Sequence, residues 1–395
     1  MKLSIKHSEV KILLIITAFF FLGMHLVYYA TFCLLLASDK LLVLLKRASF
    51  RVREFITLFI CIVFLIIVYV NGYPNMHIDK SYLPLILLLL TTILFFIVNT
   101  ESVNVGFSVI QAYIVGMFFK SFITVLYSYI NGGEMYGYGM LLDPLSGTIV
   151  NSPAYVALLS ITFAFCYTSL FSRCSGLSNK TNIFILAISL LLAIYLGGRA
   201  FFIIILLTMA LNFVAFKSSR KLSFIILLAF IFLAFMIVLF FSQVLQDKMN
   251  FLFLRFTNSG LESPRFLLWK DALTKIPNYP FGGFSVDTSL EFTYWYHNLW
   301  LDTARLGGWS ALGLLVIINI IIALISLIAF KKNSYVKHMF VIQTICLAVM
   351  AQEVILEGVL EVIGAYLILG IFLVRLSVKS ELKNEKISNN NYLHV

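Results

Sequence analysis

Charged residues are scarce in this sequence. They make up 12% of its 395 residues, compared with about 25% in a typical soluble domain. Hydrophobic residues make up 61%, and the mean hydropathy is +0.99. A water-soluble core of this size could not hide so much apolar surface. The composition therefore excludes a soluble globular protein and indicates an integral membrane protein.

Several motifs that carry chemistry in other proteins are also missing. The sequence has no HExxH or clustered-carboxylate metal motif and no GxxxxGK phosphate-binding loop. Its five cysteines lie in or beside apolar runs, or in a connection that we place in the cytoplasm, and they indicate no disulfide framework. We therefore expect no metal and no cofactor.

The net charge is +11, but the basic residues stand in short clusters between apolar runs. A protein that binds nucleic acid would present a continuous basic face instead. The clusters are typical of topology signals in a membrane protein, so no nucleic-acid partner is expected.

Long apolar runs rich in Leu, Ile and Phe follow one another along the chain. A transmembrane helix takes about 20 residues, whereas strands of an outer-membrane barrel alternate apolar and polar positions over about ten residues. The runs do not alternate, so we predict an all-α protein with about 12 transmembrane helices in a lipid bilayer. The expected spans are 11–22, 25–45, 54–71, 82–98, 104–130, 153–172, 183–196, 200–216, 222–242, 306–330, 338–352 and 358–376.

This number of crossings places every strong basic cluster on the same side of the membrane. By the positive-inside rule that side is the cytoplasm, and both termini lie there. The opposite face then carries one large loop, about 242–305, with short helices in it. We expect 1–379 to form a single polytopic membrane domain and 380–395 to form a mobile cytoplasmic tail. The clusters are Lys46, Arg47, Arg51 and Arg53; Arg173 and Lys180; Lys217, Arg220 and Lys221; Lys331, Lys332 and Lys337; and Lys379, Lys383 and Lys386.

One arginine interrupts the apolar pattern. Arg199 follows Gly197 and Gly198 at a tight corner between two spans on the side of the large loop. A charge at the centre of a bilayer costs about 2.5–3.5 kcal/mol on insertion scales. Arg199 is therefore either an interfacial residue that closes a hairpin, or a ligand contact at the mouth of a cavity where Gly198 lets the backbone approach closely.

The large loop contains a predicted helix that starts after Ser263 and Pro264 and carries Arg265 and Trp269. Arg265 is either a surface residue of this helix or a ligand contact. For Trp269 we favour packing of the helix onto the membrane domain over contact with a substrate.

A second group of polar residues stands where the loop leads into a span: His297, Asn298, Asp302 and Arg305. Taken singly, each is as well explained by capping or packing at the interface. Together, arginines and one histidine suit a diphosphate and a hydroxyl that must lose a proton. Arginine binds phosphate oxygens bidentately, and histidine transfers protons near neutral pH.

Three glutamates, Glu353, Glu357 and Glu361, follow one another at intervals of four in an otherwise apolar segment. On a helix they would share one face. Three interpretations are open: they face water at the outer turn, they form an ion-coupling site, or they are partners for the arginines.

The order of these motifs resembles the bacterial O-antigen polymerase and O-antigen ligase superfamily. A Gly-Gly-Arg corner is followed by S-P-R-F-x-x-W, then P-x-G-G, then H-N-x-x-L-D-x-x-R-x-G-G at the start of a span. The resemblance covers residues 197–315 by motif, and the rest only by span count and by the single large loop. Many relatives carry an acidic residue in an E-x-G-x-x-G element after H-N-x-x-L. Here that place reads Ala-Arg-Leu-Gly-Gly, and Asp302 is the nearest carboxylate.

The resemblance implies a metal-independent glycosyltransferase of the bacterial inner membrane, working on its periplasmic face. Its donor would be an oligosaccharide carried on undecaprenyl pyrophosphate, and its pathway partners would be a flippase and a chain-length regulator. Carried over to this chain, Arg199 and Arg265 would bind the pyrophosphate and His297 would act on the acceptor hydroxyl. Arg305, Asn298, Asp302, Trp269 and Gly198 would help to bind substrate.

Polymerase and ligase share these motifs. The bias toward Phe, Ile, Lys and Asn is typical of antigen gene clusters, and it favours a polymerase that joins lipid-linked repeat units. The alternative is a ligase that transfers the glycan to lipid A-core. Two other classes also stay open: a twelve-span secondary transporter, for which the three glutamates are the best argument, and a lipid-binding scaffold without enzymatic activity.

Overall fold

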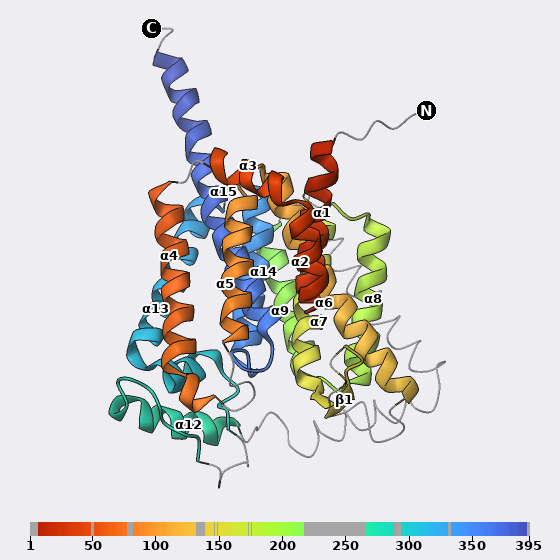
Figure 1. Cartoon of the computed structure of the whole chain (residues 1–395), viewed down its shortest axis with the longest axis vertical. Coiled ribbons are helices and arrows are strands. Elements are labelled where there is room, and N and C mark those ends of the chain that lie inside the picture. Colours follow the sequence, from red (N-terminus) through yellow and green to blue (C-terminus); the bar gives the residue numbers. More distant parts are fainter. Residues whose placement is uncertain are drawn as a thin grey trace.

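The computed structural model describes residues 7–48, 51–76, 82–131, 139–145, 147, 149–172, 174, 176–216, 265–287, 289, 294–330 and 333–392. Helices pack side by side in an elongated bundle (Figure 1). The helices are α1 (His7–Gly23), α2 (Val27–Leu36), α3 (Ser38–Arg47), α4 (Val52–Ile66), α5 (Leu83–Val98), α6 (Val103–Asn131), α7 (Ser152–Phe171), α8 (Asn179–Tyr195), α9 (Arg199–Ala215), α12 (Arg265–Lys275), α13 (Leu299–Ala329), α14 (Ser334–Met350) and α15 (Leu360–Tyr392). Shorter elements are a π-helical turn η1 (Ile67–Asn71), two 3-10 turns, η2 (Tyr73–Asn75) and η5 (Ile276–Asn278), and the strands β1 (Met140–Leu142) and β2 (Ile149–Asn151).

The helices confirm a multi-pass helical membrane protein. Among the described residues, five stretches are long and apolar enough to cross a bilayer, and further apolar helices are slightly shorter. Each predicted span coincides with a helix of the structure except two. The span 25–45 breaks into two helices, and 222–242 lies outside the described residues, as does the part of the large loop before Arg265. The total of 12 crossings therefore stays a prediction. The five stretches are Val52–Asn71, Val103–Asn131, Ser152–Phe171, Leu299–Ala329 and Leu360–Ser377.

The two ends of the bundle differ in character. One end, which we call the basic side, holds α3, the start of α8 and the far end of α15 (Figure 1). The opposite end, the loop side, holds α12, β1 and the turn between α14 and α15. Lys46 and Arg47 end α3, and Lys180 and Lys337 lie in the first turns of α8 and α14. The described basic clusters thus lie together, as the predicted topology requires.

The second predicted span, 25–45, is not one straight helix. It breaks into α2 and α3, which meet at 71° at Ala37, and α3 lies along the basic side (Figure 1). The ten residues of α2 rise about 15 Å, which is half of a hydrocarbon core of about 30 Å. The charges of α3 near both of its ends, with leucines between them, suit a helix in the interface rather than one that crosses.

The expected mobile tail is helical through residue 392, because α15 continues to Tyr392. No glycine or proline interrupts residues 371–392, and Glu, Leu and Lys favour helix there. A small departure from the all-α prediction is the antiparallel hairpin of β1 and β2, in which Leu141 pairs with Val150 between α6 and α7.

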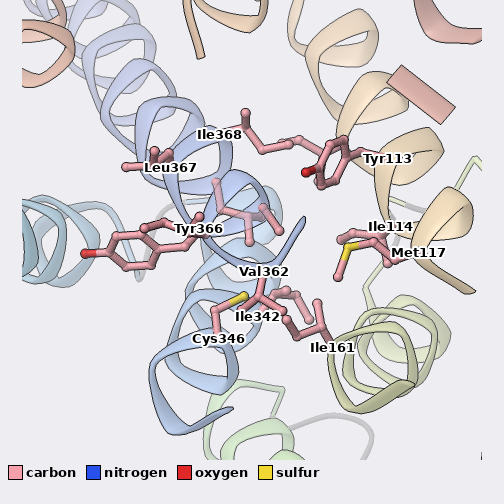
Figure 2. Packing of buried hydrophobic residues seen from close by; sticks show 14 of the residues in the cluster. Tyr113, Ile114, Met117, Ile161, Ile342, Cys346, Val362, Tyr366, Leu367 and Ile368 are labelled. Carbon is pink, nitrogen blue, oxygen red and sulfur yellow. The ribbon is translucent and has the colours of Figure 1, made fainter. Parts of the chain in front are cut away.

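The first half of α15 is the centre of the bundle. In the most apolar stretch of this helix 94% of the residues are buried, against 28% in that of α13. Val362 of α15 lies among side chains of α14, α6 and α7, whereas Tyr366 points away from α6 and α7 (Figure 2), and its hydroxyl donates to Asn319 of α13 at 2.9 Å. Since lipid is as apolar as these side chains, the helices associate through close packing and polar contacts rather than through a hydrophobic effect.

The closest helix crossing joins α1 to α6. A Cβ on Gly23 would lie 2.0 Å from the carbonyl oxygen of Tyr113, and one on Gly116 would lie 2.1 Å from that of Phe20. Glycine is thus required on both helices for their backbones to touch. This contact carries the chain to the turn at His25, which faces the first turn of α15.

Candidate functional site

The loop-side site is built on two pairs of glycines that meet. The chain after α12 turns at Gly282 and Gly283, with φ of 78° and 84°, and docks onto a break in α13 at Gly308, with φ of 65° and ψ of −156°. The backbone N–H of Trp309 donates to the carbonyl of Pro280 at 2.9 Å. A Cβ on Gly308 would lie 2.2 Å from that carbonyl oxygen. The P-x-G-G motif and the Gly-Gly that begins the span therefore form one joint.

A small apolar core lies beneath α12. It consists of Leu268, Ala272, Phe284, Val286 and Tyr296, with Trp269 packed against it. The indole N–H of Trp269 donates to the carbonyl of Tyr296 at 3.0 Å. This agrees with the packing interpretation of Trp269: it fastens α12 to the segment that carries His297.

Asn298 and Asp302 shape that segment. Asn298 is the N-cap of α13, and its side-chain oxygen accepts from the backbone N–H groups of Trp300 and Leu301. Asp302 accepts from the backbone N–H groups of Tyr296 at 3.1 Å and of Asn298 at 3.4 Å. Asp302 thus holds the backbone on both sides of His297, and Asn298 caps the helix that follows.

His297 adopts a conformation that non-glycine residues rarely take, with φ of 51°. Its Nδ1 is buried and finds no hydrogen-bond partner among the described residues. Burial, and then the positive charge of Arg265, lower its pKa to about 4. The imidazole is therefore neutral at neutral pH, with one ring nitrogen that can accept a proton.

Arg265 is the first residue of α12 and reaches the turn between α14 and α15. Its Nη1 donates to the carbonyl of Gln352, and its Nη2 lies 3.5 Å from Oε1 of Glu353. The Arg265 side chain is 27% exposed, against 11% for that of Glu353. Burial raises the pKa of Glu353 to about 7, although Arg265 acts in the opposite direction. A guanidinium open to solvent thus lies in front of a carboxyl group that titrates near neutral pH.

Arg305 is fully buried instead. Its Nε donates to Asp302 at 3.2 Å, its Nη1 to the carbonyl of Asn75 at 2.9 Å, and its Nη2 to Glu357. Tyr69 holds the same turn by donating to the carbonyl of Leu356 at 2.7 Å. Arg305 therefore ties α13 to η2 and to the α14–α15 turn, and this arrangement suits a positioning role better than contact with a substrate.

The three glutamates do not share a helical face, contrary to expectation. Glu353 and Glu357 lie in the non-helical turn 351–359, and Glu361 is the second residue of α15. Each pairs with a basic group from a different element: Glu353 with Arg265, Glu357 with Arg305, and Glu361 with Lys120 and His25. The interpretation as partners of the arginines is confirmed for the first two. Of the three, Glu353 is the one that faces the partly exposed Arg265, and its only sequence signal is the spacing of the three glutamates.

The Gly-Gly-Arg corner lies where α8 meets α9. Gly197 has a φ of 63°, and a Cβ on Gly198 would lie 2.7 Å from the side chain of Val156. Gly198 thus permits close packing against α7. Arg199 begins α9, but its side chain lies outside the described residues, so its predicted place beside Arg265 and His297 stays a prediction.

Within the described ranges, no three His, Cys, Asp or Glu side chains are grouped so that they could hold a metal ion. No protein-family model matches the chain, and a search of curated proteins gives no significant match either.

Proposed function

We propose that this protein is a lipid-linked glycosyltransferase whose site lies on the loop side, and that it polymerises O-antigen or a related surface polysaccharide. The observation that carries the proposal is the buried, neutral imidazole of His297, whose pKa burial and the positive charge of Arg265 both lower. Its Nδ1 is buried and has no hydrogen-bond partner in the part of the chain that the structure describes, and the guanidinium that acts on it is partly exposed. The motif order that resembles the polymerase and ligase superfamily supplies the substrate class.

In the proposed reaction, an acceptor hydroxyl attacks the anomeric carbon of a glycan carried on undecaprenyl pyrophosphate. The bond to the pyrophosphate breaks, and the hydroxyl proton passes to a ring nitrogen of His297. Arg265, together with Arg199 by resemblance, stabilises the charge that develops on the leaving diphosphate. Asn298, Asp302 and Arg305 hold the imidazole and the α14–α15 turn in place.

The proposed location is the bacterial inner membrane, with the loop side in the periplasm. The support is the gathering of the described basic clusters at the opposite end of the bundle, which the positive-inside rule assigns to the cytoplasm. A lipid-linked donor would then reach Arg265 from the outer leaflet.

Lipopolysaccharide banding of a deletion strain tests this proposal. Reintroducing the wild-type gene should restore a ladder of chain lengths, whereas Arg265→Ala and His297→Ala should not. Lys270→Ala removes an exposed basic residue from the same helix and serves as the matched control. A full ladder with either site variant, at normal protein level, would rule out the assignment.

The same gel distinguishes polymerase from ligase. A lost polymerase leaves a single repeat unit on the core, and a lost ligase leaves bare core with polymer still on the lipid carrier. We expect the first pattern.

A second candidate function is transport, and one cluster favours it. Glu361 is buried and accepts from Lys120 and from Nδ1 of His25, although all three lie on helices or turns of the membrane domain. Ionisable groups at such depth are often parts of ion pathways. Ion-coupled uptake into vesicles that Glu361→Gln abolishes would support transport, and its absence in wild-type vesicles would exclude it.

A further inference from the structure

We propose that the carboxylate of Glu353 occupies the phosphate-binding position on Arg265 until a lipid-linked diphosphate displaces it, and that the displaced carboxyl group takes up a proton. The inference rests on the proposed function for the identity of the anion. It adds a residue and a proton that the resemblance does not supply.

The contact between the two side chains is loose. Nη2 of Arg265 lies 3.5 Å from the carboxylate oxygen, beyond the usual 2.7–3.2 Å of a hydrogen bond. The other end of the guanidinium is fixed, since Nη1 donates to the backbone carbonyl of Gln352. The side chain of Asn298 holds the same turn by donating to the carbonyl of Ala351 at 3.2 Å. Arg265 can therefore stay in place while its partner changes.

The difference in exposure between Arg265 and Glu353 allows an incoming anion to replace the carboxylate. Arg265 is 27% exposed and Glu353 only 11%, so an anion from outside meets the guanidinium first. A diphosphate offers oxygens for two parallel hydrogen bonds with the guanidinium, which one oxygen at 3.5 Å does not supply. The incoming anion thus gains more from Arg265 than Glu353 does.

The charged groups around Glu353 determine what happens after the exchange. From α12, Arg265 faces it; from the segment before α13, the nearby imidazole of His297 is neutral at neutral pH. On the same turn Glu357 is already paired with Arg305 of α13. Among the described residues, Arg265 is thus the charge that keeps Glu353 ionised.

Burial already raises the pKa of Glu353 to about 7 with Arg265 beside it. When a diphosphate neutralises the guanidinium, the carboxyl group loses its stabilising charge and its pKa rises further. Glu353 then binds a proton at neutral pH. Below pH 7 the group is already protonated and does not compete, whereas above pH 7 each further unit should weaken binding by up to tenfold.

Calorimetric titration of the full chain in nanodiscs with inorganic pyrophosphate tests this coupling. Glu353→Gln carries no titratable carboxyl group, so at pH 8 it should bind pyrophosphate about tenfold more tightly than wild type. The difference should disappear at pH 6. Repeating the titration in two buffers of different ionisation enthalpy should show a proton uptake in the wild type that the variant lacks. Any protonation of the pyrophosphate itself is common to both proteins and cancels.

Asp287→Asn is the matched control, because it removes an exposed loop-side carboxylate away from Arg265 and should leave the pH dependence unchanged. If Glu353→Gln does not fold, Glu353→Asp retracts the carboxyl group by one methylene and should also bind more tightly at pH 8. A folded variant with wild-type affinity and proton uptake overturns the inference. So does a folded wild type that binds no pyrophosphate.

Two further experiments test whether the ligand is lipid-linked, and whether the Glu353 exchange stands independently of the proposed glycosyltransferase function. A polyprenyl diphosphate should bind more tightly than inorganic pyrophosphate, and the reverse order would overturn the assignment to a lipid-linked ligand. If the exchange holds while His297→Ala still supports a full polysaccharide ladder, the glycosyltransferase proposal fails and the Glu353 exchange stands.

Discussion

Two arginine–glutamate pairs lie at opposite ends of the bundle and differ in how firmly they are held. On the basic side, Nη1 of Arg375 lies 3.2 Å from both carboxylate oxygens of Glu54, and its Nη2 donates to the carbonyl of Thr100. On the loop side, Nη2 of Arg265 lies 3.5 Å from Oε1 of Glu353, and the Arg265 side chain is partly exposed. The same two residue types thus form a structural clamp in one place and an exchangeable contact in the other.

The difference follows from what surrounds each pair. Glu54 and Arg375 are both buried, and together they join α4, α15 and the end of α5. A buried pair leaves an uncompensated charge when one partner is removed, whereas a solvent-accessible pair contributes little. A residue that must meet a substrate cannot be fully engaged by the protein, and Arg265 meets that condition better than Arg375 or Arg305.

The largest expected effect is the loss of stability when the buried pair of Arg375 and Glu54 is broken. Arg375→Ala should lower the free energy of unfolding by about 3–5 kcal/mol, because Glu54 is left buried without its partner. Arg265→Ala should lower it by less than about 1 kcal/mol, because Arg265 is partly exposed and Glu353, whose pKa is already about 7, takes up a proton when the guanidinium is removed. Thermal unfolding of the two variants in the same detergent measures both, and equal losses would contradict the comparison.

The next effect is a loss of folding stability at acidic pH that His297 causes. The pKa of His297 is about 4 in the folded protein, against its usual value of 6.5. Because the folded state disfavours the proton, stability is fully present above pH 6.5 and is lost as the pH falls from 6.5 through 4. The loss should reach about 3 kcal/mol in that window. His297→Gln should unfold with a weaker dependence on pH there, and an unchanged acid profile would argue against a buried neutral imidazole.

Much of the fold follows from local sequence. Apolar runs predicted helices wherever the structure describes them, because spanning helices satisfy their own backbone hydrogen bonds and need only apolar side chains. The bend at Ala37 was missed because the apolar run continues through it, although Asp39 and Lys40 lie immediately beyond. The helical end of α15 was not predicted, because its composition is polar and lacks an apolar run; whether it is mobile stays a prediction.

The sequence predicted which residues form the site, but not which residues they contact. Their identities stand in the motifs, but their partners lie far along the chain: Arg305 meets Glu357 across 52 residues, and Arg265 meets Gln352 across 87. Spacing alone placed the glutamates on a helix, whereas the chain forms a turn at 351–359 that tertiary contacts hold open. Which arginine is buried and which is exposed depends on those contacts and not on the local sequence.

The joint between the two glycine pairs should give a moderate effect. Gly308→Ala forces a Cβ against the carbonyl of Pro280 in a conformation open only to glycine, and should cost about 1–3 kcal/mol. Gly313→Ala on the same helix meets nothing within 4 Å and should be neutral or slightly stabilising. Limited proteolysis of the segment after α12 reports the undocking, and equal protection of both variants would show that the joint is not needed.

The smallest expected effect is at Tyr69. Tyr69→Phe removes one hydrogen bond to the carbonyl of Leu356 and should lower stability by about 1 kcal/mol. The variant separates an effect on stability from an effect on activity, because the turn that carries Glu353 loses one of the hydrogen bonds that hold it in place. A larger fall in polymer formation than in unfolding temperature would show that the position of the turn matters to the reaction, and parallel falls would show that it does not.

Polymer formation by the purified chain from an undecaprenyl-pyrophosphate-linked repeat unit tests the central claim most directly. Wild-type protein and Lys270→Ala should produce a ladder of lengths in the presence of a chelator, whereas Arg265→Ala and His297→Ala should leave the repeat unit unchanged. A ladder of normal yield from either site variant would contradict the account, since the reaction would then proceed without the guanidinium or without the imidazole on which it depends.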